Sequence, residues 1–508
     1  MKDSVRRRFA FTLATNLVRA GLNFMTGMLI ARWLEPARYG SLAFLLGTFV
    51  GIRQLLELGS SSAFFTFLSQ RARSGQFIRL FWGWMLLQFL IPLLALGFLF
   101  PTQWIDVIWR GESRGLVLLA FVAVFMQYNL WPAVQQMGEA QRETVRVQGA
   151  GALVALVHFA AMMALWWLGR LGIYAVFLAI AVEYFLAATA VGLTLPARSA
   201  APEAETARDI LGMYLGYCWP LIPYAIFGFA HEFADRWLLQ KHGGAVEQAY
   251  YAVGAQFGAI AMLATTSILR IFWKEIAEAY HQQNHERAGQ LYRKVSRLLY
   301  FTGSVIAGFL IPWSEALLRE ILGAAYAGGA TTLAVMFLYP VHQSMGQIGG
   351  TMLYATERTK ELVIIGIAFI FLSMTATYFV LAPRTASIPG LGLAAEGLAW
   401  KMVIMQFIQV NVVAILIARI WKWRFDWFYQ VGGLGGCLLL GWMAHYLSVS
   451  VLGSEAKLGL AMSLGVLIYL AALASLVMLW PTLTGLTRSE LYANYREVVL
   501  RASAIFER

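Results

Sequence analysis

Long, uninterrupted apolar runs recur along the whole chain. A helix needs roughly 20 consecutive apolar residues to cross the hydrocarbon layer of a membrane. A backbone in hydrocarbon must satisfy its own hydrogen bonds, and continuous runs favour helices over the alternating pattern of a closed barrel. Only 13% of the residues are charged, whereas a soluble domain carries about 25%. The sequence therefore predicts an all-α, polytopic membrane protein.

We expect about fourteen membrane-spanning helices, and this even number places both termini on the same side. The expected spans are residues 9–31, 40–68, 77–100, 115–137, 147–168, 173–195, 213–239, 250–275, 298–320, 331–353, 362–382, 396–419, 429–448 and 459–480.

Lysine and arginine are distributed unevenly between the segments that join these spans. Counted with the adjoining ends of the spans, the segments on the side of the N-terminus hold 25 of the 39 Lys and Arg residues and those on the other side hold 10; the remaining four, Arg19, Arg53, Arg270 and Lys401, are counted within spans. Cytoplasmic loops of membrane proteins carry the excess of positive charge. We therefore predict a multi-pass membrane protein with both termini in the cytoplasm. The net charge of +12 has the same origin and does not indicate a nucleic-acid partner.

The spans group into two related halves. The tripeptide Arg-Trp-Leu at the end of the first span (32–34) recurs at the end of the seventh (236–238), which suggests a duplicated bundle, as in many transporters. A polar helix is expected on the inner surface at 276–297. The predicted division is an N-terminal six-helix bundle (1–195), a cytoplasmic linker (196–212), a second six-helix bundle (213–419), two additional spans (420–480) and an amphipathic cytoplasmic tail (481–508).

Short motifs along the chain resemble those of a known transporter family. Residues 31–40 (ARWLEPARYG) resemble the aR-x-L-x-P-x-x-YG signature that follows the first helix of this family. Similar motifs follow in the expected order at 235–239 (DRWLL), 321–326 (ILGAAY) and 388–395 (IPGLGLAA). The chain thus resembles the polysaccharide transporters, the O-antigen (Wzx-type) flippases of the multidrug/oligosaccharidyl-lipid/polysaccharide exporter (MOP) superfamily.

This resemblance implies two six-helix bundles in a V around a central cavity, with two further C-terminal helices. It implies a flippase that moves an undecaprenyl-pyrophosphate-linked oligosaccharide, an O-antigen or exopolysaccharide repeat unit, to the outer leaflet by alternating access. The implied partners are that substrate, bacterial membrane lipids, and the polymerase and glycosyltransferases of lipopolysaccharide and polysaccharide biosynthesis.

Arginines within the first two spans are the strongest candidates for a substrate site. Charged residues at membrane depth are costly and usually face a cavity or a partner. Arg19 shares a helix face with two asparagines, and Arg53 lies four residues before Glu57. The guanidinium fork suits phosphate oxygens, so both arginines are expected to hold the lipid pyrophosphate; the alternative is that Arg53 pairs with Glu57 for structure alone. The predicted substrate-binding residues are Asn16, Arg19, Asn23, Arg53, Gln54 and Arg270.

Acidic residues in the spans are candidates for ion coupling. Glu57 and Glu183 lie in the middle of spans, and Asp235 lies nearer the end of the seventh. A carboxyl group in this setting can carry a proton or can be a neutral or paired structural group. Lys401 is expected to extend its side chain toward the membrane surface.

Two other functions remain open at this point. A cation-coupled multidrug exporter of the same fold would use the acidic residues, and a non-transporting membrane scaffold of a polysaccharide synthesis complex would use neither set. We found no nucleotide-binding loop, no cluster of metal ligands and no paired nucleophile and base. We therefore expect neither an enzyme nor a cofactor or metal site.

Overall fold

The structure is a computed structural model that describes residues 5–195, 206–423, 425, 427–453, 456–485, 488 and 490. The side chains of 5–10, 261, 263–268, 270 and 271 are outside this description. Across the described residues every element is helical, which confirms the all-α prediction. Most of the predicted linker (196–205) and of the predicted tail (486–487, 489 and 491–508) lies outside the described residues.

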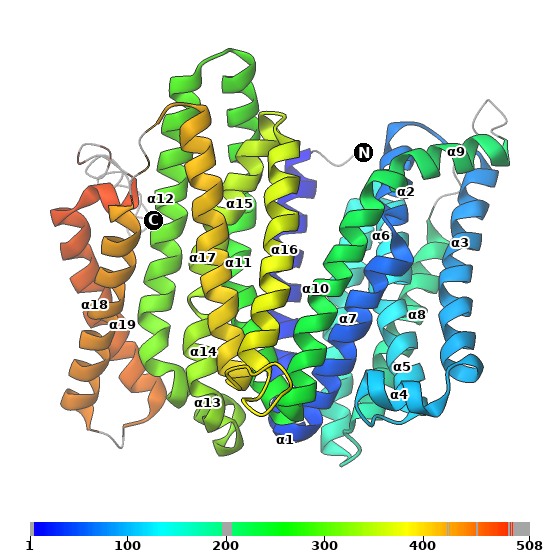
Figure 1. Ribbon diagram of the computed structural model, residues 1–508, viewed down its shortest axis with the longest axis horizontal. Helices are drawn as coiled ribbons and strands as arrows, with labels where there is room; N and C mark the ends of the chain where they lie inside the picture. The colour runs from blue at the N-terminus through cyan, green and yellow to red at the C-terminus, as the bar shows by residue number, and fades with distance from the viewer. Residues whose placement is uncertain are drawn as a thin grey trace, which may run out of the picture. The chain divides into compact units, whose positions relative to one another are not determined.

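Contacts along the chain define two compact units (Figure 1). The first unit comprises Met1–Ala252 and Ser373–Ala394. Its elements are α1 (Val5–Glu57), α2 (Ser60–Gln70), α3 (Gly75–Leu94), the π-helix η1 (Ala95–Leu99), α4 (Thr102–Trp109), α5 (Arg114–Phe125), the π-helix η2 (Met126–Leu130), α6 (Trp131–Ala140), α7 (Thr144–Trp167), α8 (Ile173–Thr194), α9 (Ala207–Cys218), η3 (Trp219–Leu221), α10 (Ile222–His242), the start of α11 (Gly244–His281) and the end of α16 (Thr359–Leu381).

The second unit comprises Val253–Leu372 and Ala395–Arg508. Besides the remainder of α11 and α16, it holds α12 (His285–Leu310), η4 (Ile311–Trp313), α13 (Ser314–Leu322), η5 (Ala324–Gly329), α14 (Ala330–Met336), α15 (Tyr339–Ala355), α17 (Ala394–Ile420), α18 (Phe428–Leu452), α19 (Leu458–Leu479) and η6 (Pro481–Thr484). The predicted division into two six-helix bundles, a linker, two extra spans and a tail remains a prediction.

Twelve helices among the described residues are long and apolar enough to cross a membrane. The first of these covers 47 residues, Phe11–Glu57, and at 1.5 Å per residue it is about twice as long as a single crossing requires. It contains the first two predicted spans. The predicted span 250–275 lies in α11, where several side chains are outside the description. These two differences account for the gap between twelve helices and the fourteen expected spans.

The division of α1 into two spans occurs at Glu35. This residue has a φ of 60° and a ψ of 165°, so it interrupts the helix, and Pro36 then begins the second half. Proline suits the first turn of a helix because its missing N–H would have no partner there. Gly40 follows, and a Cβ at this position would lie 1.7 Å from the carbonyl oxygen of Ala245. The motif that carries the family resemblance therefore serves a chain reversal and close backbone packing.

The segment 276–297 does not lie along the membrane surface as a separate helix. α11 continues to His281, and α12 begins at His285, so the two helices extend the spans and meet in a short turn. Apolar residues of both helices, including Ile276 and Tyr292, are buried in a core cluster with α15 and α17. This burial explains why apolar residues are scattered through a mostly polar segment.

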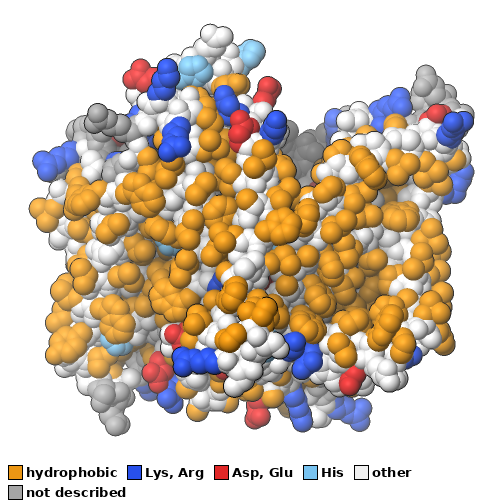
Figure 2. Space-filling model, in the orientation of Figure 1, with side chains coloured by type: hydrophobic (Ala, Val, Ile, Leu, Met, Phe, Trp, Pro, Cys, Tyr) orange, Lys and Arg blue, Asp and Glu red, His pale blue; other side chains and the backbone are white. Residues whose placement is uncertain are grey.

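The outer surface of the helices is apolar. Figure 2 shows hydrophobic side chains covering the middle of the helices, while charged side chains gather toward the helix ends. Large apolar side chains such as Phe98 and Leu193 are at least 80% exposed. Apolar side chains exposed in this way are unfavourable in water, whereas the hydrocarbon of a membrane solvates them. The structure therefore supports the predicted multi-pass membrane protein.

Candidate functional site

Arg53 forms a hydrogen bond with a backbone carbonyl of another helix, that of Tyr128. In a regular α-helix that carbonyl would accept the N–H of the residue four positions later, but that residue is a proline, Pro132, which has none. The intervening segment is the π-helix η2, a form that is frequent at functional sites. Arg53 Nη1 donates a hydrogen bond to the Tyr128 oxygen at 3.1 Å. The local sequence of η2 and α6 thus creates an acceptor for a cation on α1.

Arg53 also forms the ion pair that its spacing from Glu57 allows. Arg53 Nη1 lies 3.0 Å from Glu57 Oε2, with the two side chains 30% and 16% exposed. The Nε atom of Arg53 is buried and has no hydrogen-bond partner among the described residues. Arg53 is therefore paired but incompletely satisfied, and it retains donor capacity for an anionic ligand.

A further cation packs against the second half of α1 and was not selected from the sequence. A Cβ at Gly47 would lie 2.2 Å from Arg236 Nε of α10, so the glycine makes room for this side chain. Arg236 and Arg53 both act electrostatically on the Tyr128 hydroxyl. The charge count had assigned Arg236 to an outer segment because it ends the predicted seventh span; only the tertiary structure places it beside α1.

Glycines on both helices set the approach of α1 to α10. At Gly228 of α10 a Cβ would lie 2.6 Å from Gln54 Oε1. The predicted site residue Gln54 therefore faces α10.

Arg19 lies in a second polar group, between α1, α6 and α7. Arg19 Nη2 donates a hydrogen bond to Asn16 Oδ1 at 2.9 Å, as the shared helix face predicts. Its Nη1 and Gln135 Nε2 both lie over Gly151, each 3.3 Å from the position of a Cβ there. Gln135 Nε2 is buried without a partner in the described part of the chain. The third residue of the predicted stripe, Asn23, is exposed.

Tyr184 lies between these groups. Gln127 Nε2 of η2 donates a hydrogen bond to the Tyr184 hydroxyl at 3.3 Å, and both Arg19 and Glu183 act electrostatically on that hydroxyl. We refer to Arg19, Arg53 and Arg236 as the cation cluster. All three arginines are on transmembrane helices of the first unit, and only Arg53 has a carboxylate partner among the described residues.

Glu183 pairs with a histidine that the sequence analysis overlooked. His158 Nδ1 of α7 lies 2.7 Å from Glu183 Oε2 of α8, and the two side chains are 14% and 10% exposed. A lone histidine in an apolar run gives no signal in the sequence, and the contact spans 25 residues. An imidazole and a carboxyl group at hydrogen-bond distance can share and exchange a proton.

Asp235 belongs to a separate buried network within the first unit. It is 6% exposed, and Oδ1 accepts a hydrogen bond from the Thr377 hydroxyl of α16 at 2.6 Å. His231 lies one turn before Asp235, and its Nε2 is 2.9 Å from Ser373 Oγ. The network joins α10 to the end of α16, through contacts that the sequence did not show.

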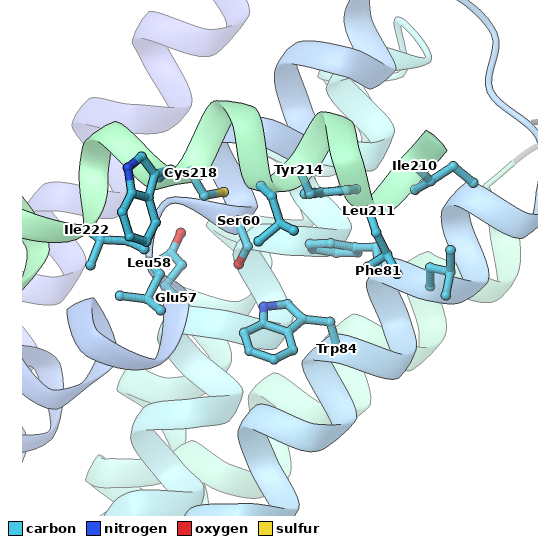
Figure 3. A pocket seen from close by; sticks show the side chains of 13 residues that line it. Glu57, Leu58, Ser60, Phe81, Trp84, Ile210, Leu211, Tyr214, Cys218 and Ile222 are labelled. Carbon is cyan, nitrogen blue, oxygen red and sulfur yellow. The ribbon is translucent and has the colours of Figure 1, made fainter. Parts of the chain in front are cut away.

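An apolar cavity of about 240 Å³ lies beside the Arg53–Glu57 pair, between the end of α1 and helices α2, α3 and α9 (Figure 3). Glu57 and Ser60 are polar groups at its wall, and Trp84 and Phe81 form part of its apolar lining. The lining is mainly apolar, so the cavity suits an apolar chain.

Two predicted cations of the second unit have different outcomes. The Arg270 side chain lies outside the described residues. The sequence analysis expected Lys401 to extend toward the membrane surface, and this prediction is wrong. Lys401 is 3% exposed, and its Nζ lies 3.8 Å from Met402 Sδ. The position of Lys401 near the end of a predicted span did not reveal this burial.

The fold of this chain is similar to the folds of solved transporters. No protein-family model matches the chain, and no curated protein matches it in sequence. A solved structure of the lipid II flippase MurJ in an inward closed conformation has a TM-score of 0.70 and 13% identity, covering 92% of this chain and 99% of that one. An inward-facing multidrug resistance MATE family transporter of the MOP superfamily has a TM-score of 0.55 and 13% identity, covering 82% and 97%.

A MOP superfamily transporter from Pyrococcus furiosus, whose structure was described by the reversed polarity of its binding pocket, has a TM-score of 0.52 and 12% identity, covering 81% and 94%. At such identities the likeness shows the fold alone. The chain thus has the fold of MOP transporters, as predicted, and these neighbours are transporters rather than enzymes.

Proposed function

We propose that this protein is a flippase that moves an undecaprenyl-pyrophosphate-linked oligosaccharide, an O-antigen or exopolysaccharide repeat unit, from the cytoplasmic to the outer leaflet. The observation that carries the proposal is the cation cluster, three arginines on transmembrane helices of one unit with a single carboxylate partner among the described residues. An arginine on a transmembrane helix that is only partly exposed and lacks a full set of partners is costly. A pyrophosphate supplies the missing negative charge and acceptor oxygens.

The apolar cavity lined by Glu57, the ion-pair partner of Arg53, supports a lipid-linked substrate. Its mainly apolar lining suits the lipid chain, while the anionic head group is assigned to the arginines of the cation cluster. In this proposal the substrate carries two or more negative charges outward. The inside-negative membrane potential favours this direction by about 2.3 kcal/mol per charge per 100 mV. Alternating access between the predicted bundles, 1–195 and 213–419, moves the head group, with both termini in the cytoplasm and the polysaccharide polymerase and glycosyltransferases as partners.

The experiment is transport of a fluorescent undecaprenyl-pyrophosphate oligosaccharide by the full chain in proteoliposomes. Arg19→Ala and Arg53→Ala should each lower the rate at least tenfold, while Arg53→Lys retains part of it. Arg319→Ala is the matched control, because Arg319 is an exposed arginine paired with Glu315 in the second unit. Full activity of both cation-cluster variants would refute the assignment of the head group.

A cation-coupled multidrug exporter is the second candidate, and the buried His158–Glu183 pair favours it. A proton-exchanging pair serves an antiporter as readily as a flippase. The same proteoliposomes distinguish the two functions: efflux of a cationic dye under a proton gradient, with no movement of the lipid-linked oligosaccharide, would establish the exporter. A protein that moves neither substrate would favour the scaffold.

A further inference from the structure

A cavity in the second unit contains two arginines and has no role in the proposed transport. It has a volume of about 110 Å³ and lies between α12, α17 and α18. Arg293 and Arg297 of α12 line it together with the buried Tyr292 and Ser296. Trp423 and Phe425, from the segment that joins α17 to α18, form an aromatic wall, and Tyr429 closes the α18 side.

Arg293 and one hydroxyl of this cavity have unused hydrogen-bonding capacity. Arg293 makes a single hydrogen bond among the described residues, from Nε to the Gly289 carbonyl at 3.2 Å. Ser296 is 3% exposed, and its Oγ acts on the neighbouring Tyr292 hydroxyl but has no other partner in the described part of the chain. A buried hydroxyl of this kind is unfavourable unless a ligand or water satisfies it. Both Nη groups of Arg293 and the Ser296 hydroxyl are therefore donors for a ligand.

The two guanidinium groups also favour an anion between them. Arg293 and Arg297 are four residues apart on α12, a spacing at which like charges repel. Arg297 is positioned by its neighbours: it lies 5.1 Å over the Tyr429 ring, and Nη1 donates to the Thr482 carbonyl at 3.3 Å. An anion in the cavity would relieve the repulsion and accept from both guanidinium forks.

The position of the cavity indicates a lipid. Trp427 and Phe428, next to the aromatic wall, are 42% and 62% exposed, and aromatic residues gather at the membrane–water interface. The excess of Lys and Arg predicts that this end of the unit faces the cytoplasm. Basic pockets between transmembrane helices on that side bind the head groups of anionic lipids.

We propose that the cavity lined by Arg293, Ser296 and Arg297 binds the phosphate group of an anionic phospholipid. The two arginines hold the phosphate oxygens, and the Ser296 hydroxyl donates to one of them. The aromatic wall contacts the glycerol and the first carbons of the acyl chains. This site lies in the second unit, and the cation cluster lies in the first.

The test measures binding of phosphatidylglycerol to the purified full chain in detergent, by native mass spectrometry and by the thermal shift that the lipid produces. Arg293→Gln should weaken phosphatidylglycerol binding about fivefold, the effect of one basic residue near an anionic head group. Arg293→Lys should retain most of the affinity, and Ser296→Ala should reduce it with the charge unchanged. Arg319→Gln, which removes an exposed arginine elsewhere in the unit, is the matched control and should have no effect.

Each outcome of the binding measurements either supports or overturns the proposed phospholipid site. Phosphatidylcholine that binds as tightly as phosphatidylglycerol would overturn the proposal, as would equal affinities of the Arg293→Gln and Arg319→Gln variants. Inorganic phosphate that displaces the lipid at low millimolar concentration and gives the same thermal shift would identify a free-anion site instead. Arg293 lies outside the cation cluster, so transport of the oligosaccharide in lipid-matched proteoliposomes tests the proposed function separately. If the protein does not transport the oligosaccharide, the result of the phosphatidylglycerol-binding measurement still stands.

Discussion

His158 Nδ1 lies 2.7 Å from Glu183 Oε2 between α7 and α8, which places an imidazole and a carboxyl group in hydrogen-bond contact inside otherwise apolar helices. Two groups of this kind at hydrogen-bond distance can exchange a proton. The contact joins α7 to α8, so a conformational change that separates these helices would break it.

We predict that Glu183→Gln removes the dependence of transport on a proton gradient. The glutamine keeps the shape and a hydrogen bond to His158 but cannot exchange a proton with the imidazole, so transport should no longer respond to the gradient. Transport in proteoliposomes with and without a pH gradient measures this. Glu361→Gln, at a partly exposed glutamate paired with Arg358, is the control. A Glu183→Gln protein that still responds to the gradient would exclude the pair from coupling.

The second prediction concerns the proline that frees the Tyr128 carbonyl. Pro132→Ala restores an N–H four residues after Tyr128, and this donor competes with Arg53 for the carbonyl oxygen. Loss of one hydrogen bond to a charged donor corresponds to about a tenfold effect, so we expect transport to fall about tenfold with unfolding temperature unchanged or raised. Pro92→Ala is the control, because Pro92 also lies next to a π-helix but far in sequence from the cluster. Equal rates for both variants would show that the carbonyl does not position Arg53.

The apolar runs were sufficient to predict the helical membrane fold, because a helix in lipid is determined by length and hydropathy. The interruption at Glu35 was also predictable in outline, since Pro36 is close to where the first span was expected to end. The extension of α11 and α12 beyond the membrane was not predictable. Burial of residues such as Ile276 depends on partners in α15 and α17 that a linear pattern does not contain.

The site was predicted only where its residues are close in sequence. Asn16 and Arg19, and Arg53 and Glu57, are one helical turn apart, and both contacts are present. The partners that the sequence did not reveal come from other helices: Arg236 beside α1 and His158 beside Glu183. Such contacts depend on how helices pack, and a single sequence gives no pairing information between distant positions.

The third prediction tests the close contact at the chain reversal. Gly40→Ala places a Cβ 1.7 Å from the Ala245 carbonyl oxygen, a distance that the backbone must relieve by moving. We expect a loss of about 1–3 kcal/mol in stability, seen as a lower unfolding temperature in detergent. Gly83→Ala is the matched control, because Gly83 is also inside a helix and a Cβ there meets nothing within 4 Å. A helix gains stability from alanine over glycine, so the two variants should shift in opposite directions.

The fourth prediction separates a structural from a functional role for Asp235. Thr377→Val preserves the shape of the side chain but removes the hydroxyl that donates to Asp235 Oδ1 at 2.6 Å. Losing this donor to a buried carboxylate should cost about 1–3 kcal/mol, measured as a lower unfolding temperature. Thr189→Val is the control, since that exposed hydroxyl bonds only a carbonyl of its own helix among the described residues.

Transport by the Thr377→Val protein, measured well below its unfolding temperature, then distinguishes the roles. If Asp235 serves to hold α10 against the end of α16, the rate should follow the loss of stability and recover fully at low temperature. An Asp235 that carries the coupling ion would instead give a lasting defect and an altered dependence on the ion gradient, because valine changes the hydrogen bonding of the carboxyl group itself. We expect recovery, since the short hydrogen bond to Thr377 and the adjoining His231–Ser373 contact join the two helices in a buried polar network.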